Sequence, residues 1–197
     1  MKQRNAETRR TTNETDVKVV LDLDGSGEVD VSTGIGFFDH MLAAFGRHGL
    51  FDLAVHTKGD LEVDGHHTVE DTGIMLGKAF AQALGDKRGI VRFGSLAVPM
   101  DEALVLAACD ISGRGQLHWD AQVPPVMIGA FDASLAKEFF IAFAANAGVT
   151  LHVREIAGEN AHHVVEAMFK AVARSLRAAV ELDPRSADVL PSTKGVL

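Results

Sequence analysis

The sequence predicts an α+β fold in which one β-sheet and helix unit occurs twice. Three observations predict this fold: hydrophobic residues make up 47% of the 197 residues, β-rich segments alternate with amphipathic helical segments, and both halves show the same order of segments. The clearest repeat is a His-His-x-x-Glu sequence over residues 66–70, which returns over residues 162–166. Residues 14–27 also align without a gap with residues 102–115.

The first half predicts five elements from hydrophobic periodicity and turn signals. They are strands over 17–23 and 28–32, a helix over 37–49, a strand over 51–57 and a helix over 66–84. The first two strands flank Asp24-Gly25-Ser26-Gly27, a turn signal that predicts a β-hairpin. Gly49 and Gly85 suit the C-terminal caps of the two helices.

The second half predicts the same kinds of element. They are strands over 91–98, 103–111 and 116–120, a helix over 133–147, a strand over 149–154 and a helix over 161–180. We expect loops at Pro124-Pro125 and from Pro184 onward, and helices that cover one face of each small sheet. The half-repeats are expected to span 1–95 and 96–197 and to pack as one compact domain.

The charge balance disfavours two classes of protein. The chain carries 19 basic and 27 acidic side chains, a formal net charge of −8, whereas binders of nucleic acid or membrane surfaces have a basic excess. Its longest apolar runs have seven residues, far fewer than the ~20 of a membrane helix. The N-terminus lacks the apolar core of a signal peptide, and the single Cys109 is expected to be a buried strand residue. We therefore expect a cytoplasmic, soluble protein.

The repeated His-His-x-x-Glu sequence is typical of a metal site at the start of a helix. His66 and Glu70 share a face at i and i+4, while adjacent His66 and His67 diverge by roughly 100°, so that neighbouring imidazoles can face two different ions. Imidazole and carboxylate suit manganese, iron or zinc, and the lack of thiolates argues against a structural zinc site. One copy would be weak support, because histidines at helix starts are commonly solvated; two copies at corresponding places favour a metal.

Spacing along the sequence does not decide which histidine of the first half is a further metal ligand. His152 ends an apolar strand before the second motif and is a credible ligand. Its counterpart in the first half could be His56, ten residues before His66 just as His152 precedes His162, or His40, whose neighbour Asp39 could orient the ring.

The few basic residues include a set that suits an anionic group. Arg92, Arg114, Lys170 and the final Ser192-Thr193-Lys194-Gly195 supply the forks, ammonium and hydroxyls that a phosphate needs. Each alone is more simply a solvated surface charge.

Taken together, these residues resemble the imidazoleglycerol-phosphate dehydratase family, lyases of histidine biosynthesis. The resemblance covers residues 10–15, 33–42, 59–61, 64–73, 99–103, 112–114, 162–171 and 191–195. It implies a duplicated fold like domain 2 of ribosomal protein S5, forming one dehydratase domain. It also implies a homo-oligomer of 24 subunits, with active sites between subunits that hold two manganese ions each.

The resemblance also implies site residues. The implied metal ligands are His40, His66, His67, Glu70, His152, His162, His163 and Glu166, which favours His40 over His56. The implied catalytic residues are Glu14, His40, His67, Glu70, His163 and Glu166. The implied substrate and phosphate group comprises Glu14, Arg92, Arg114, Lys170, Ser192, Thr193 and Lys194. His56 and Gly115 depart from the family pattern, which has a small residue and often Pro at these positions.

The implied chemistry is dehydration of D-erythro-imidazoleglycerol phosphate to imidazole-acetol phosphate. The carbon that loses a proton has no adjacent carbonyl, so an imidazolate bound by two manganese ions would expel the hydroxyl and give a diazafulvene-like intermediate. Glu14 is the expected acid/base group. Two other functions fit parts of the sequence: a dinuclear metallohydrolase acting on a phosphate ester, and an RNA-binding module, which the acidic balance disfavours.

Overall fold

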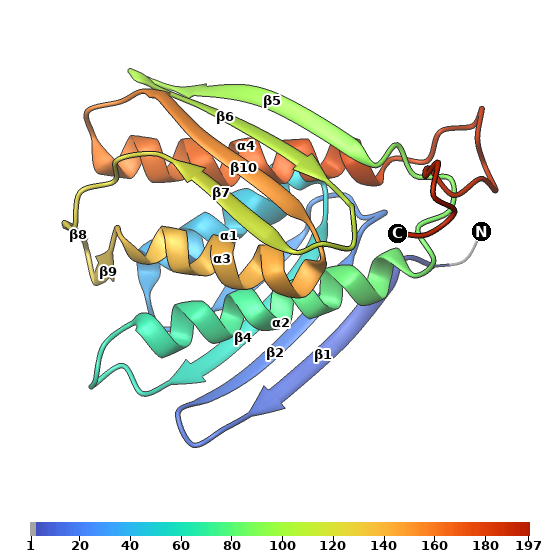
Figure 1. The fold of residues 1–197 in the computed structure, drawn as a ribbon. Helices are drawn as coiled ribbons and strands as arrows, with labels where there is room; N and C mark the ends of the chain where they lie inside the picture. Colours follow the sequence, from blue (N-terminus) through green and yellow to red (C-terminus); the bar gives the residue numbers. More distant parts are fainter. Residues whose placement is uncertain (1–2) are drawn as a thin grey trace.

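Two β-sheets enclose a layer of four helices in the computed structural model, which describes residues 3–197 (Figure 1). The first half contains β1 (Asn5–Thr11), β2 (Thr15–Asp22), β3 (Val29–Ser32), α1 (Gly36–Gly49), β4 (Asp52–Gly59) and α2 (His66–Leu84). The second half contains β5 (Phe93–Met100), β6 (Ala103–Asp110), β7 (Gln116–Asp120), β8 (Met127–Ile128), β9 (Phe131–Asp132), α3 (Leu135–Ala147), β10 (Thr150–Ala157) and α4 (Ala161–Val180). The first and the last of the described residues lie at the same side of the molecule.

The two four-stranded sheets have the same topology. Their strand orders are β1-β2-β4-β3 and β5-β6-β10-β7, and in each the last strand pairs in parallel while the others pair antiparallel. The duplicated α+β fold is therefore confirmed. The division at residues 95/96 stays a proposal and falls within β5.

The helices pack between the two sheets, and helices of the first half contact helices of the second half. α2 packs on β1 and β2, α4 packs on β5 and β6, and between the sheets α2 meets α3 while α1 meets α4. Phenylalanines from all four helices pack on one another in the core, as Phe45 of α1 and Phe80 of α2 do on Phe143 of α3. The fully buried ones are Phe38, Phe45, Phe51, Phe80, Phe131, Phe139, Phe140, Phe143 and Phe169. The contact between α1 and α4 matters most for function, since it joins residues far apart in sequence.

The predicted β-hairpin over 17–32 is wrong. β3 pairs in parallel with β4, which lies between β2 and β3. The physical reason is Asp52 at the start of β4, whose Oδ1 accepts the backbone N–H groups of Ser26, Gly27 and Glu28 at 2.7, 3.0 and 2.9 Å. These bonds tie the turn to β4, so the chain crosses to the far side of that strand.

We expect Asp52→Asn to weaken the fold at neutral pH and to make its stability less sensitive to acid. Backbone hydrogen bonds from Glu28, Ser26 and Gly27 lower the pKa of Asp52. A carboxyl with a lowered pKa stabilises the folded state above its unfolded pKa, and that stabilisation is lost as the pH falls through the lowered value. Urea unfolding at a series of pH values measures the effect. Glu28→Gln is the control, and equal acid sensitivity of wild type and Asp52→Asn would contradict the role.

Two glycines let α2 approach α3 closely. A Cβ atom at Gly73 would lie 2.7 Å from the carbonyl oxygen of Phe139, and one at Gly77 would lie 2.6 Å from that of Phe143. These distances are shorter than any real Cβ contact, and the obstacles are backbone atoms. The glycines are one turn apart on α2 and therefore share the face that meets α3.

Gly77→Ala is expected to destabilise the fold by about 1–3 kcal/mol, because overpacking a helix contact forces backbone shifts. The matched control is Gly36→Ala in the first turn of α1, where a Cβ meets nothing within 4 Å in the described part of the chain. Denaturant unfolding of both variants measures the difference. A Gly77→Ala variant as stable as Gly36→Ala would disprove the close packing.

Most other sequence predictions agree with the structure. The helices over 66–84 and 161–180 and the strand over 116–120 have the predicted bounds. Cys109 is buried in β6, and burial raises the pKa of its thiol to about 12. β1, β8 and β9 were not predicted. Among residues 3–197, no helix has both the length and the apolar character needed to cross a bilayer.

Candidate metal centre and active site

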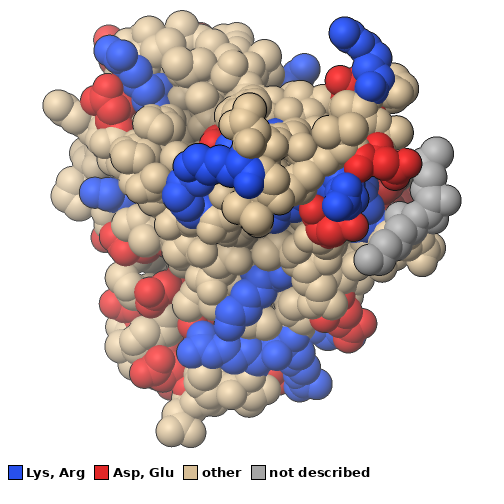
Figure 2. Space-filling model, turned by 45° about the vertical axis from the view of Figure 1, so that its right-hand side comes forward, with Lys and Arg blue, Asp and Glu red and all other residues tan. Residues whose placement is uncertain are grey.

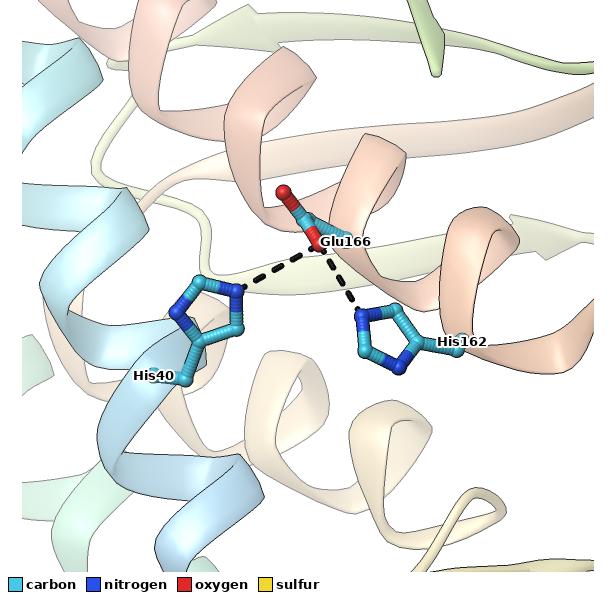
Figure 3. A group of neighbouring side chains, drawn as sticks. All are labelled: His40, His162 and Glu166. Atoms are coloured by element: carbon cyan, nitrogen blue, oxygen red, sulfur yellow. Dashed lines mark hydrogen bonds and ion pairs between the residues drawn. The ribbon is translucent and has the colours of Figure 1, made fainter. Parts of the chain in front are cut away.

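His40, His162 and Glu166 meet where α1 packs on α4 (Figure 3). Oε2 of Glu166 lies 3.4 Å from Nε2 of His40 and 3.2 Å from Nε2 of His162. His162 and Glu166 are at i and i+4 of α4, which puts them on one face, and His40 reaches them from the other half of the chain. The side chain of Glu166 is only 8% exposed, whereas the imidazoles are open to solvent at 54% and 41%.

Lys170 keeps Glu166 ionised. Burial raises the pKa of the Glu166 carboxyl, but the hydrogen bond and charge of Lys170, with His40, outweigh burial and hold that pKa below its usual value. Nζ of Lys170 lies 2.6 Å from Oε1 of Glu166. The other oxygen, Oε2, is therefore available as a negatively charged metal ligand, and it faces the two imidazoles.

This donor set fits a divalent metal. The three ligand atoms lie within 4.8 Å of one another, and two imidazoles with one carboxylate suit manganese, iron or zinc. A pocket of about 440 Å³ adjoins the cluster and is lined by His40, Glu166, Lys170 and Arg47 among others. Hollows of about 600 and 620 Å³ lie on the outer sheet faces, away from this cluster, and neither is lined by a residue of the triad.

The first motif forms a looser counterpart at the start of α2. Nε2 of His66 lies 3.8 Å from Oε2 of Glu70, and both side chains are exposed to solvent. The two helix starts are held alike: Asp64 accepts the backbone N–H of His66 at 2.7 Å, and Asn160 accepts that of His162 at 2.9 Å. Two groups of candidate metal ligands therefore result: the pair His66 and Glu70 on α2, and the triad where α1 meets α4.

Adjacent motif histidines face different partners, as the helical spacing predicts. The ring centroids of His66 and His67 are 6.4 Å apart and those of His162 and His163 are 5.9 Å apart, and the ring planes are inclined to each other by 85° and 77°. His67 bonds Asp60, which raises the pKa of its imidazole, and His163 bonds Glu102, which raises the pKa of that ring.

The sequence motifs assign no role to Asp60 or Glu102. Backbone N–H groups, led by that of Asn160, and the His163 bond lower the pKa of Glu102 to about 2. The internal repeat could have indicated a role for Glu102, because it aligns Glu102 with Glu14, a residue already predicted to act in the site.

Glu14 lies in the turn between β1 and β2 with a free carboxylate. Its side chain is 55% exposed, and Oε1 lies 4.0 Å from Nε2 of His67. Within residues 3–197 its carboxylate makes no hydrogen bond. The next residue, Thr15, bonds the buried carboxylate of Asp71, which Arg10 also pairs. The turn is thus anchored to α2 while the Glu14 side chain stays available.

The predicted ligand His152 does not join the triad within one chain. It lies on the outer face of the second sheet, where its ring stacks on His118 with 4.2 Å between centroids. His56 lies on the outer face of the first sheet, 3.2 Å from Asp30, while His40 is in the triad.

The predicted phosphate residues fall into two places. Arg92 donates to Asp110 at 2.7 Å and to the carbonyl of Pro191 at 2.7 Å, and Arg114 lies 3.9 Å from the same Asp110. Arg92 therefore lies beside the C-terminal tail at Pro191, which the predicted residues Ser192, Thr193 and Lys194 follow in the chain, while Arg114 shares the partner Asp110. Lys170 lies instead at the triad, bonded to Glu166.

Comparison with known proteins identifies the relatives of this chain. A family model described as imidazoleglycerol-phosphate dehydratase matches residues 33–176. The chain belongs to the imidazoleglycerol-phosphate dehydratase family. Its likeness to individual members of that dehydratase family extends almost from end to end. The dehydratase of Acidiphilium cryptum (strain JF-5) is 60% identical over 194 residues, which cover 98% of this chain and 99% of the relative. That of Dinoroseobacter shibae is 59% identical over 194 residues, covering 98% and 100%.

Solved dehydratase structures share the fold. The imidazoleglycerol-phosphate dehydratase of Staphylococcus aureus subsp. aureus N315 has a TM-score of 0.82 and 36% identity, covering 91% of this chain and 99% of its own. The enzyme of Pyrococcus furiosus, solved in complex with (S)-C348, has a TM-score of 0.82 and 38% identity, covering 96% and 100%. The imidazoleglycerol-phosphate dehydratases are hydro-lyases, and this chain is an enzyme of that class.

Proposed function

We propose that this chain dehydrates D-erythro-imidazoleglycerol phosphate to imidazole-acetol phosphate in the cytoplasm, with two manganese ions in each active site. The observation that carries the proposal is the triad of His40, His162 and Glu166 in a member of the dehydratase family. The second ion would be held by the donors of the first motif, His66 and Glu70, 3.8 Å apart. His67, His152 and His163 would complete the two ligand sets.

In the proposed reaction the metal ions and Glu14 have separate roles. Bound divalent ions would hold the substrate's ring nitrogens and favour its imidazolate form. In that form the ring could expel the hydroxyl beside it, which would take up a proton and leave as water, and a diazafulvene-like intermediate would result. Loss of a proton from the next carbon would return the electrons to the ring, which regains a proton, and would give an enol that becomes the ketone. Glu14 moves that proton, because its carboxylate is exposed and makes no hydrogen bond to the described residues.

The substrate's phosphate is bound by Arg92 and Arg114, with Ser192, Thr193 and Lys194 of the tail. Arg92 and Arg114 already converge on the carboxylate of Asp110, as they would on an anion. Lys170 is the remaining member of this group. Basic and acidic side chains both occur on the face shown in Figure 2, and the chain as a whole has an acidic excess of 27 to 19, so we assign selection of the anion to this local group.

The active site is completed between subunits of a homo-oligomer, for which we propose 24 copies. The predicted ligands His67, His152 and His163 lie outside the triad, on surfaces that another copy can reach. The outer face of the second sheet supports this assembly: it carries Leu104, Leu106 and the 57% exposed Phe93. The first sheet instead covers its outer face with ion pairs, such as Arg9 with Asp16 at 2.8 Å. Sedimentation measures the particle mass, and a monomer would contradict the assembly.

The activity is tested by adding manganese and imidazoleglycerol phosphate to metal-stripped protein. We expect imidazole-acetol phosphate to form only with the metal restored. Absence of product from the restored protein would overturn the proposal. Release of inorganic phosphate without a ketone would assign a metallohydrolase instead.

A further inference from the structure

Each motif contains one histidine whose ring is held from the Nδ1 side by a carboxylate. Nδ1 of His67 lies 3.0 and 3.2 Å from the two oxygens of Asp60, and Nδ1 of His163 lies 2.7 Å from Oε2 of Glu102. Neither carboxylate is part of the triad or of the phosphate group described above.

The opposite nitrogen of each ring is not hydrogen-bonded to the described residues. The nearest carboxylate oxygens to Nε2 are Oε1 of Glu14, 4.0 Å from His67, and Oδ2 of Asp101, 3.5 Å from His163. A carboxylate can only accept a hydrogen bond, so an Nδ1 atom that faces one carries the proton in the neutral ring. The lone pair then lies on Nε2, which is the form that binds a metal ion.

We propose that Asp60 and Glu102 are positioning residues that hold His67 and His163 as Nδ1–H tautomers, with each Nε2 free to bind a metal ion. The metal in this statement rests on the proposed function; the tautomers do not.

The carboxylate of Glu102 and the backbone of Asp60 are themselves held in place. Oε1 of Glu102 accepts the backbone N–H groups of Asn160 and Glu159 at 2.9 and 3.3 Å, immediately before α4. The backbone N–H of Asp60 donates to the carbonyl of Glu14 at 3.1 Å, and its side chain is only 19% exposed. The carboxylate of Glu102 is therefore fixed to the backbone that precedes α4, and Asp60 is fixed to the turn that carries Glu14.

The two halves perform this task with residues that do not correspond. The internal alignment pairs Glu102 with Glu14, yet in the first half Asp60 contacts the histidine at Nδ1. Aligned on the two motifs, the position of Asp60 is occupied in the second half by Ile156, which can accept no such bond. In the first half Asp60 therefore orients the histidine, and the carboxylate of Glu14 remains available to carry a proton.

Solid-state NMR of full-length, metal-free protein labelled with 15N-histidine tests this inference at a pH where both rings are neutral. His67→Asn and His163→Asn assign the two signals. We expect both rings to be protonated at Nδ1 in the wild type. Asp60→Asn should admit the Nε2–H tautomer of His67 alone, and Glu102→Gln that of His163 alone, because an amide can also donate. Glu14→Gln, Glu62→Gln and Glu159→Gln should change neither ring.

Manganese titration of the same variants is the second measurement. We expect Asp60→Asn and Glu102→Gln each to weaken binding by about 10–100-fold, the usual effect of removing a carboxylate behind a ligand histidine. Nε2 protonation in the wild type, or a tautomer change of His67 in Glu14→Gln but not in Asp60→Asn, would overturn the inference. Wild-type protein with the expected tautomers but no manganese affinity would instead overturn the proposed metal function.

Discussion

Glu14→Gln is expected to lower kcat by about 10²–10⁴-fold, the usual contribution of a general acid or base. The variant should fold and bind manganese normally. The backbone of Glu14 is held by Thr12 and Asp60, and the neighbouring Thr15 anchors the turn to Asp71. None of these bonds uses the Glu14 carboxylate. The substitution therefore removes the proton carrier and leaves the turn in place.

Steady-state kinetics and metal analysis of the same preparation separate the possible results. Glu62→Gln, an exposed carboxylate in the loop between β4 and α2, is the matched control and should retain full activity. Reduced manganese content in Glu14→Gln would show that this carboxylate acts through the metal site. Turnover near that of the wild type would rule out Glu14 as the acid/base group.

The sequence predicted most elements but not how the strands are ordered. Hydrophobic periodicity identified both long helices, because a continuous apolar face is a local property. The hairpin failed because Asp52 lies far along the chain from the turn that it binds. β1 was missed because only Ala6 of its seven residues is buried, which gives an edge strand little apolar alternation.

The same distinction applies to the site. The pairing of His162 with Glu166 follows from helical spacing and was predicted. That His40, rather than His56, meets them depends on the packing of α1 against α4, to which spacing along the sequence gives no access. The orienting contacts of Asp60 and Glu102 were missed for a related reason, since a histidine motif does not show which carboxylate lies behind each ring.

Glu166→Gln is expected to remove the metal from the triad and abolish dehydration. Glu166 is the only carboxylate of the triad, and Lys170 keeps it charged despite its burial. An amide oxygen is neutral and a weaker ligand. Losing a supporting partner alone lowers metal affinity about 10–100-fold, so losing this ligand should weaken manganese binding at the triad by at least about 100-fold. Metal analysis should fall from two ions per chain to one.

Glu166→Asp and Glu138→Gln show which property of Glu166 matters. Aspartate keeps the charge but is one methylene shorter, so it should no longer reach both His40 and His162, and metal should be lost as in Glu166→Gln. Glu138 lies in the first turn of α3, away from the triad, and its substitution should leave two ions bound. Two bound ions in Glu166→Gln would exclude the triad as a metal centre, because Glu166 supplies the one carboxylate ligand of this triad.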